Sequence, residues 1–148
     1  MKIRATIAAI GTAAALGLTG TILLPAAAGA GTVTHTLAFT SVQKSQVKFS
    51  STSSGSADLD VNKAGKTIGF DMLYFAATSP SSVAVNYTLD TKGGFLYGTF
   101  TFNPRTGVVT NGKVTGGTGA FARATGTIKA KNLNAAGTRT AVTITYSG

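Results

Sequence analysis

Apolar and polar residues alternate through most of the chain after residue 32. One face of the segment at residues 33–40 carries Val33, His35, Leu37 and Phe39, and threonine and alanine fill the other face. A period of two is typical of a half-buried β-strand, because successive side chains of a strand point to opposite faces. The pattern predicts a strand here, with the face that carries Phe39 turned inward.

The same alternation, broken by clusters of turn-forming residues, predicts further strands along the chain. They lie at residues 47–49, 57–62, 66–78, 83–90, 95–103, 108–115, 126–133 and 138–146. Residues 50–56 contain only serine, threonine and glycine and are expected to form a loop. Asn111 and Gly112 predict a kink or tight turn inside one strand. No segment after residue 32 has a convincing helical period.

About eight or nine short strands without a crossover helix indicate an antiparallel meander, which can close as a barrel or stack as a sandwich. Closure is favoured because an open sheet of this length would leave adhesive edges in an exported protein. The expected fold class is therefore all-β. The interior of a barrel of about eight strands holds either packed side chains or one small ligand.

The first 30 residues have the organisation of a secretory signal peptide. Lys2 and Arg4 precede an uncharged apolar run, and the small residues of 28–30 or of 26–28 provide alternative cleavage sites. We expect a signal peptide at 1–30, a single antiparallel β-barrel domain at 31–148, and a secreted, extracellular protein. A retained N-terminal anchor is the alternative, since the apolar run is near the lower length limit for a membrane span.

Composition excludes several kinds of chemistry. The chain has no Cys, one His, and four acidic residues that are all Asp, so no disulfide, thiolate metal site or glutamate base can form. No metal and no cofactor are expected. The formal net charge is +9, but the basic residues are spread along the chain without interleaved aromatic residues. We therefore expect no nucleic-acid partner, and a weak association with an anionic cell wall.

Residues 114–126, with the sequence VTGGTGAFARATG, form the most distinctive segment of the chain. This segment resembles the GGTG-x-F-x-x-A-x-G motif shared by plant dirigent proteins and the allene oxide cyclase barrel family. Residues 57–69 look like the acidic strand, turn and glycine strand of the same barrels. The resemblance covers most of residues 33–146.

The resemblance implies an eight-stranded antiparallel, calycin-like barrel that is commonly trimeric and encloses a hydrophobic cavity. A small hydrophobic molecule bound in that cavity is the leading functional expectation. A cofactor-independent cyclase or isomerase, or a dirigent-type protein that guides a coupling reaction, is a second. A non-catalytic cell-surface structural protein is a third, since the plant cyclases depend on Glu and Cys, which this chain lacks.

The glycine segment also has an interpretation that does not depend on any family. Gly116, Gly117 and Gly119 permit positive φ, and Thr118 can hydrogen-bond within its own turn. Phe121 is then expected to plug the barrel end or the core, before the strand that starts at Gly126. A phosphate-binding loop is the alternative, but it requires a following helix that this composition does not favour.

Acidic residues and the single histidine are the weak candidates for catalysis. His35 could face inward as a general base, although a surface position near the start of its strand is the simpler interpretation. Asp71 could be buried, which would raise its pKa, or could lie on an outward polar face. Asp58 and Asp60 stand near the position of the dirigent acidic motif.

Tyrosines are the candidate ligand-binding residues. Tyr74, Tyr87 and Tyr97 could donate hydrogen bonds from a barrel wall to a ligand, and Tyr97 could also take part in proton transfer. Core or rim positions are the alternative for all three.

Overall fold

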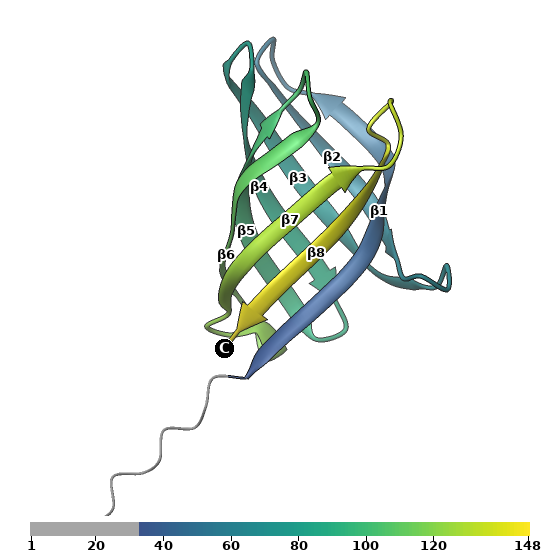
Figure 1. The fold of residues 1–148 in the computed structure, drawn as a ribbon, viewed down its shortest axis with the longest axis vertical. Helices are drawn as coiled ribbons and strands as arrows, with labels where there is room; N and C mark the ends of the chain where they lie inside the picture. Colours follow the sequence, from purple (N-terminus) through teal and green to yellow (C-terminus); the bar gives the residue numbers. More distant parts are fainter. Residues whose placement is uncertain (1–32) are drawn as a thin grey trace, which may run out of the picture. The chain divides into compact units, whose positions relative to one another are not determined.

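The computed structural model describes residues 33–148, which form a closed β-barrel of eight strands (Figure 1). The predicted signal peptide lies outside the described residues. Within residues 33–148, no helix is long and apolar enough to cross a membrane. The strands are β1 (Thr34–Lys48), β2 (Ser53–Val61), β3 (Thr67–Ser79), β4 (Ser82–Thr91), β5 (Gly94–Asn103), β6 (Val108–Gly117), β7 (Thr125–Asn132) and β8 (Arg139–Ser147).

Every strand pairs antiparallel with its neighbour in sequence, and β8 pairs with β1 to close the ring. The closing register runs without a break from Thr34 opposite Ser147 to Val42 opposite Arg139. The expectation of an all-β antiparallel barrel is thus confirmed, and the sandwich alternative is not formed. Closure pairs the strand edges that an open meander would expose to other chains.

The first hairpin differs from the sequence prediction. The sequence predicts separate strands at 33–40 and 47–49 and a loop at 50–56, but β1 is one continuous strand and β2 already begins at Ser53. A register shift between Gln43 and Ser45 carries β1 through its polar middle. The hydrogen-bonded ladder holds these residues extended although their polar side chains show no apolar alternation.

Inward-facing apolar side chains fill the barrel over much of its length. The fully buried members include Leu89, Leu96 and Ile144, whose side chains have no solvent exposure. Phe39 is buried as predicted, and Phe100 lies inside while Phe95 of the same strand lies outside. The rest of the buried core consists of Val85, Tyr87, Val114, Phe121, Ala124, Ile128 and Val142.

The glycine segment closes one end of the barrel. After β6 the chain forms a single 3-10 turn, η1 (Gly119–Phe121), which places Phe121 in the core and packs it edge-on against Tyr146 at 5.4 Å between ring centroids. Gly116 and Gly119 have positive φ, at 150° and 57°. The predictions of a structural turn and of a Phe121 plug are confirmed, and within the described residues no helix follows that could support a phosphate site.

Gly117 is required for a close approach. A Cβ at this position would meet the backbone oxygens of Phe95 and Phe121. We expect Gly117→Ala to lower the free energy of unfolding by about 2 kcal/mol or more, because backbone at such a contact cannot move without distorting the cap. Urea unfolding followed by circular dichroism measures the loss.

Gly93→Ala is the matched control at the same end of the barrel. A Cβ there would be in ordinary contact with Ala120 and Phe121 at 3.4 Å. We expect the control to change stability by less than about 1 kcal/mol. Equal losses in the two variants would contradict the role given to Gly117.

Candidate functional site

A cavity of about 650 Å³ enters the barrel from the end opposite Phe121. Its mouth is formed by the β1–β2 connection around Ser50 and the β7–β8 connection around Ala136. Apolar side chains that alternate inward along β3, β4, β5, β6 and β8 form its walls. They are Leu73, Phe75, Val83, Phe100, Phe102, Val109 and Val142.

The floor of the cavity is acidic because β2 and β3 place carboxyl groups side by side. Asp58 and Asp71 are direct cross-strand partners, and both line the cavity. Asp60 lies two residues further along β2 on the same face, next to the floor and deeper in the barrel. Tyr87 of β4 lies on the same inner face, two pairs along the β3–β4 ladder from Asp71, and also lines the cavity.

These floor groups are buried and have few partners. Asp60 and Asp71 are 0% and 1% exposed. Among residues 33–148, neither carboxyl group finds a hydrogen-bond partner of acceptable geometry, and the Tyr87 hydroxyl finds none either. Asp58 has one such contact, in which Ser41 Oγ donates to Asp58 Oδ2 at 3.1 Å. Unpartnered buried carboxyl groups are costly, because a charged form without a partner loses its hydration.

Burial and mutual repulsion therefore favour the protonated forms. Burial, followed by the charge of Asp71, raises the pKa of Asp60 to about 9. Burial, followed by the charge of Asp58, raises the pKa of Asp71 to about 7. The pKa of Asp58 is raised by burial and partly restored by its hydrogen bond from Ser41. Burial raises the pKa of the Tyr87 hydroxyl well above its usual 10.

No cation within residues 33–148 compensates these acids. The groups that influence the pKa values of Asp58, Asp60 and Asp71 are other acids and the hydroxyls of serine and tyrosine, with no Lys or Arg among them. Over the described part of the chain, no three His, Cys, Asp or Glu residues are arranged to hold a metal ion. The floor is thus a cluster of acids that share protons, facing an open apolar cavity.

The structure brings four of the candidate residues together at this floor. Asp58, Asp71 and Tyr87 line the cavity, and Asp60 lies directly behind them. The outward position considered for Asp71, among the exposed side chains of its strand, is wrong. In β3 the side chains of Phe70 and Met72 point outward, each 50% exposed, so Asp71 between them points inward.

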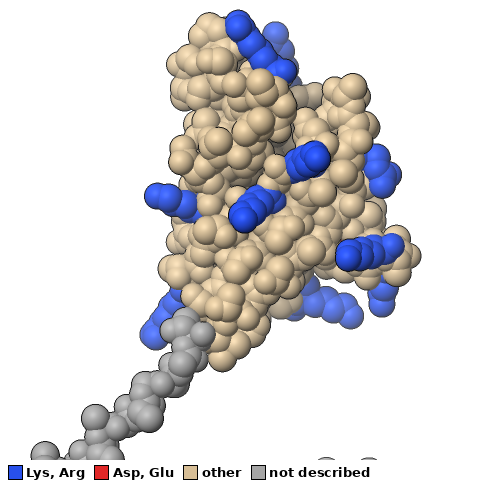
Figure 2. Space-filling view, in the orientation of Figure 1, with Lys and Arg blue, Asp and Glu red and all other residues tan. Residues whose placement is uncertain are grey.

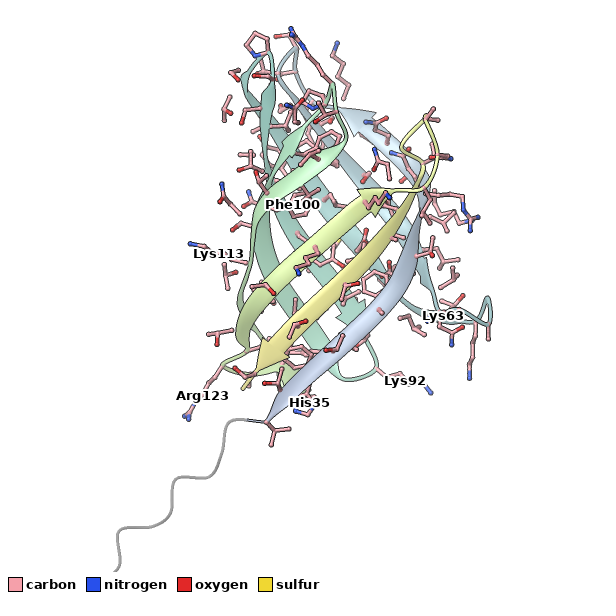
Figure 3. All side chains as sticks on the ribbon, in the orientation of Figure 1. His35, Lys63, Lys92, Phe100, Lys113 and Arg123 are labelled. Carbon is pink, nitrogen blue, oxygen red and sulfur yellow. The ribbon has the colours of Figure 1, made fainter. Side chains whose placement is uncertain are left out.

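The remaining candidates lie elsewhere. His35 is exposed near the closed end and stacks on Tyr146 at 5.3 Å, in agreement with the simpler of its two interpretations (Figure 3). Tyr74 and Tyr97 are on the outer face, 44% and 39% exposed. None of these three lines the cavity, so a ligand bound there would not contact them.

Three polar residues of the site were missed by sequence reasoning. Ser41, Ser56 and Gln43 face the cavity from β1 and β2. The signal for Ser56 was the even spacing of Ser54, Ser56, Asp58 and Asp60, which puts four polar side chains on one face of β2. This pattern is hard to recognise because the polar face of a strand is usually the outer one.

Exposed apolar side chains lie on the outer faces of β3 and β5 and at the end of β1, in two groups separated by the polar outer face of β4; together we call them the outer apolar patch. Phe49 stacks on Tyr74 at 6.0 Å and Phe95 stacks on Tyr97 at 6.5 Å. The patch consists of Val47, Phe49, Phe70, Met72, Tyr74, Phe95 and Tyr97, each at least 39% exposed.

Comparison of the chain with known protein families and with curated proteins found no match to either.

Proposed function

We propose that this protein binds a small, largely apolar molecule inside its barrel. The observation that carries the proposal is the cavity, which is open to solvent at one end of the barrel and ends inside it at the floor of Asp58, Asp71 and Tyr87. Its volume of about 650 Å³ is in the range of small-molecule sites, and its walls are apolar with a few polar groups gathered at the floor. The closed eight-stranded ring supports the resemblance to the allene oxide cyclase and dirigent barrels.

Filling the cavity tests this proposal. Ala130 lines the cavity from β7, and we expect Ala130→Trp to weaken binding of the neutral fluorescent probe N-phenyl-1-naphthylamine at least tenfold, because the indole occupies the ligand volume. Fluorescence titration measures the affinity. Ala84→Trp, on the exposed outer face of β4, is the control and should bind like the native protein. Equal affinity in all three proteins would place the probe outside the barrel and contradict the proposal.

Acid catalysis without a cofactor is the second candidate function. Near neutral pH Asp60 holds its proton and Asp71 is partly protonated, and both lie near the Tyr87 hydroxyl, an arrangement suited to protonating a bound substrate as it rearranges. Native mass spectrometry of the protein purified from its own culture medium would identify a bound molecule. Asp71→Asn should then abolish turnover of that molecule while binding persists. Unchanged turnover would contradict a catalytic role for Asp71 and leave binding as the supported function.

Self-association through the outer apolar patch is the third candidate function, in line with the trimers of the resembled families and with a structural role at the cell surface. Exposed apolar patches of this kind mark interaction surfaces. We expect Met72→Lys to shift the protein to a smaller species in light scattering coupled to size-exclusion chromatography, because a charge would be buried in the interface. Thr127→Lys, on β7, is the control. A native protein that is monomeric at all concentrations would contradict this function.

Secretion and a weak association with anionic cell-wall polymers complete the proposal. Lys and Arg project from many parts of the surface, and no acidic side chain is visible on the face in Figure 2. Three of the four Asp residues face the interior, so the exterior is more basic than the composition suggests. Salt-dependent retention on teichoic-acid-coated beads, lost at about 0.5 M salt, would be the expected behaviour of such a surface.

A further inference from the structure

The cavity floor offers hydrogen-bond acceptors in excess of donors. Asp71 has two buried carboxyl oxygens without a hydrogen-bond partner and Asp58 has one, whereas the donor that reaches Asp58 is the Ser41 hydroxyl. Tyr87 adds a hydroxyl that is also unpartnered, on a residue that is 3% exposed. A ligand with several N–H donors would satisfy more of these atoms than one with a single hydroxyl.

The charges around the cavity floor also favour a ligand that carries N–H donors. The groups that face one another across the floor are Ser41 from β1, Asp58 and Asp60 from β2, Asp71 from β3 and Tyr87 from β4, and none of them can carry a positive charge. Lys48 is the one cation among the lining residues, and it lies exposed at the end of β1, near the mouth. A cationic group at the floor would therefore meet carboxyl groups that can ionise to pair with it, and no competing cationic side chain.

We propose that the ligand of this barrel is an amphipathic amine, whose ammonium group binds between Asp58, Asp71 and the Tyr87 hydroxyl while its apolar body lies along the cavity walls. This inference rests on the proposed function and names the chemical class of its ligand. The ammonium group supplies three N–H donors and one positive charge in a water-poor site, where charge-assisted hydrogen bonds are strong. Phe75, Phe100 and Phe102 line the part of the cavity that the apolar body would occupy.

Binding of such a cation displaces protons from the floor. Because the pKa of Asp71 is raised to about 7, part of its population is protonated at neutral pH and must ionise to pair with the ammonium. Affinity for the amine is therefore expected to increase between pH 6 and pH 8, with protons released to the buffer. An uncharged ligand of the same shape should show no such increase.

Three probes with the same apolar chain separate the possibilities in isothermal titration. We expect 1-decylammonium to bind the native protein at least tenfold tighter than 1-decanol, and decanoate to bind more weakly than either. Titrations at pH 7 in two buffers of different ionisation enthalpy should show proton release for the amine alone. Nonspecific attraction cannot produce this order, because the exterior is basic and repels the ammonium.

Asp71→Asn should remove the preference for the amine while decanol still binds. Asp58→Asn provides a second test if that variant does not fold, and Asp90→Asn is the control, since Asp90 lies on the outer face of β4. Decanol binding as tightly as decylammonium, or an amine preference that survives both floor substitutions, overturns the inference and leaves the proposed function standing. If no probe binds to either the native or the Ala130→Trp protein, both this inference and the proposed function are overturned.

Discussion

The free energy of unfolding is expected to fall by roughly 3 kcal/mol as the pH rises from 5 to 8, the reverse of the usual acid denaturation of proteins. The folded pKa values of about 9 for Asp60 and about 7 for Asp71 lie above the 3.8 of an unfolded Asp. Between these limits the folded state holds more protons than the unfolded state, so raising the pH favours unfolding. The contribution is complete below about pH 4 and is lost progressively as the pH rises from there to about 7 for Asp71 and about 9 for Asp60.

Two such groups would account for more than 3 kcal/mol over this interval if the floor stayed dry, because each tenfold difference in proton affinity between the folded and unfolded states is equivalent to about 1.4 kcal/mol. We expect less, because water that enters from the cavity mouth and local relaxation both stabilise the charged forms. Urea unfolding at a series of pH values measures the dependence, and the midpoint of thermal unfolding should decrease by roughly 10 °C over the same range.

The variant Asp60→Asn tests whether ionisation of Asp60 causes this dependence of stability on pH. Asn has the shape of the protonated acid and cannot ionise, so the variant should be more stable than the native protein at pH 8 and should show a flatter dependence on pH. Asp90→Asn, the control on the outer face, should keep the native slope. A native protein whose stability increases from pH 5 to pH 8 would show that the buried acids are ionised and paired.

Much of the fold could be predicted from alternation alone. The strands at 66–78, 83–90 and 95–103 agree closely with β3, β4 and β5, because turn-forming residues bound each run and β-branched and aromatic residues fill it. The cost of free edges favours closure, and the β1–β8 pairing provides it. The kink predicted at Asn111 is present as a residue of positive φ, at 55°, inside β6.

The candidate site was harder to predict, because there the usual assignment of polar residues to the outside is reversed. Ser56, Asp58 and Asp60 face inward from β2, and Asp71 faces inward from β3, while Met72 and Tyr74 face outward. Alternation determines which residues share a face, but the assignment of that face depends on neighbouring strands. For β3, apolar on both faces, the sequence left the choice open.

The side chain of Phe121 is expected to contribute about 3–5 kcal/mol to stability, so Phe121→Ala should be among the most destabilising single substitutions in the barrel. The ring is 5% exposed, packs edge-on against Tyr146 and lies over Gly93. Its removal leaves a gap at the closed end that the short η1 turn cannot fill, because Gly117 and Gly119 already hold that turn against backbone atoms of its neighbours. Urea unfolding at pH 5 measures the loss without interference from the ionisation of the acids.

Phe95→Ala is the matched control for this prediction. Phe95 lies on β5 near the same end, but its ring is 39% exposed on the outer face, so truncation should cost less than about 1 kcal/mol.

A second measurement, the dependence of stability on pH, tests whether Phe121 also keeps water away from the buried acids. The cross-strand row of Asp60, Gly69, Thr91 and Gly94 leads from the acidic floor to the strand against which the cap rests.

Water admitted at that end would stabilise ionised Asp60, so Phe121→Ala should also weaken the decrease of stability between pH 5 and pH 8. Phe95→Ala should leave that slope unchanged. If Phe121→Ala loses much stability but keeps the native dependence of stability on pH, Phe121 only fills volume. A loss accompanied by a flatter dependence of stability on pH would mean that the protonated state of the floor depends on the Phe121 plug. Closing one end of the barrel would then be what keeps the acids of the cavity floor protonated.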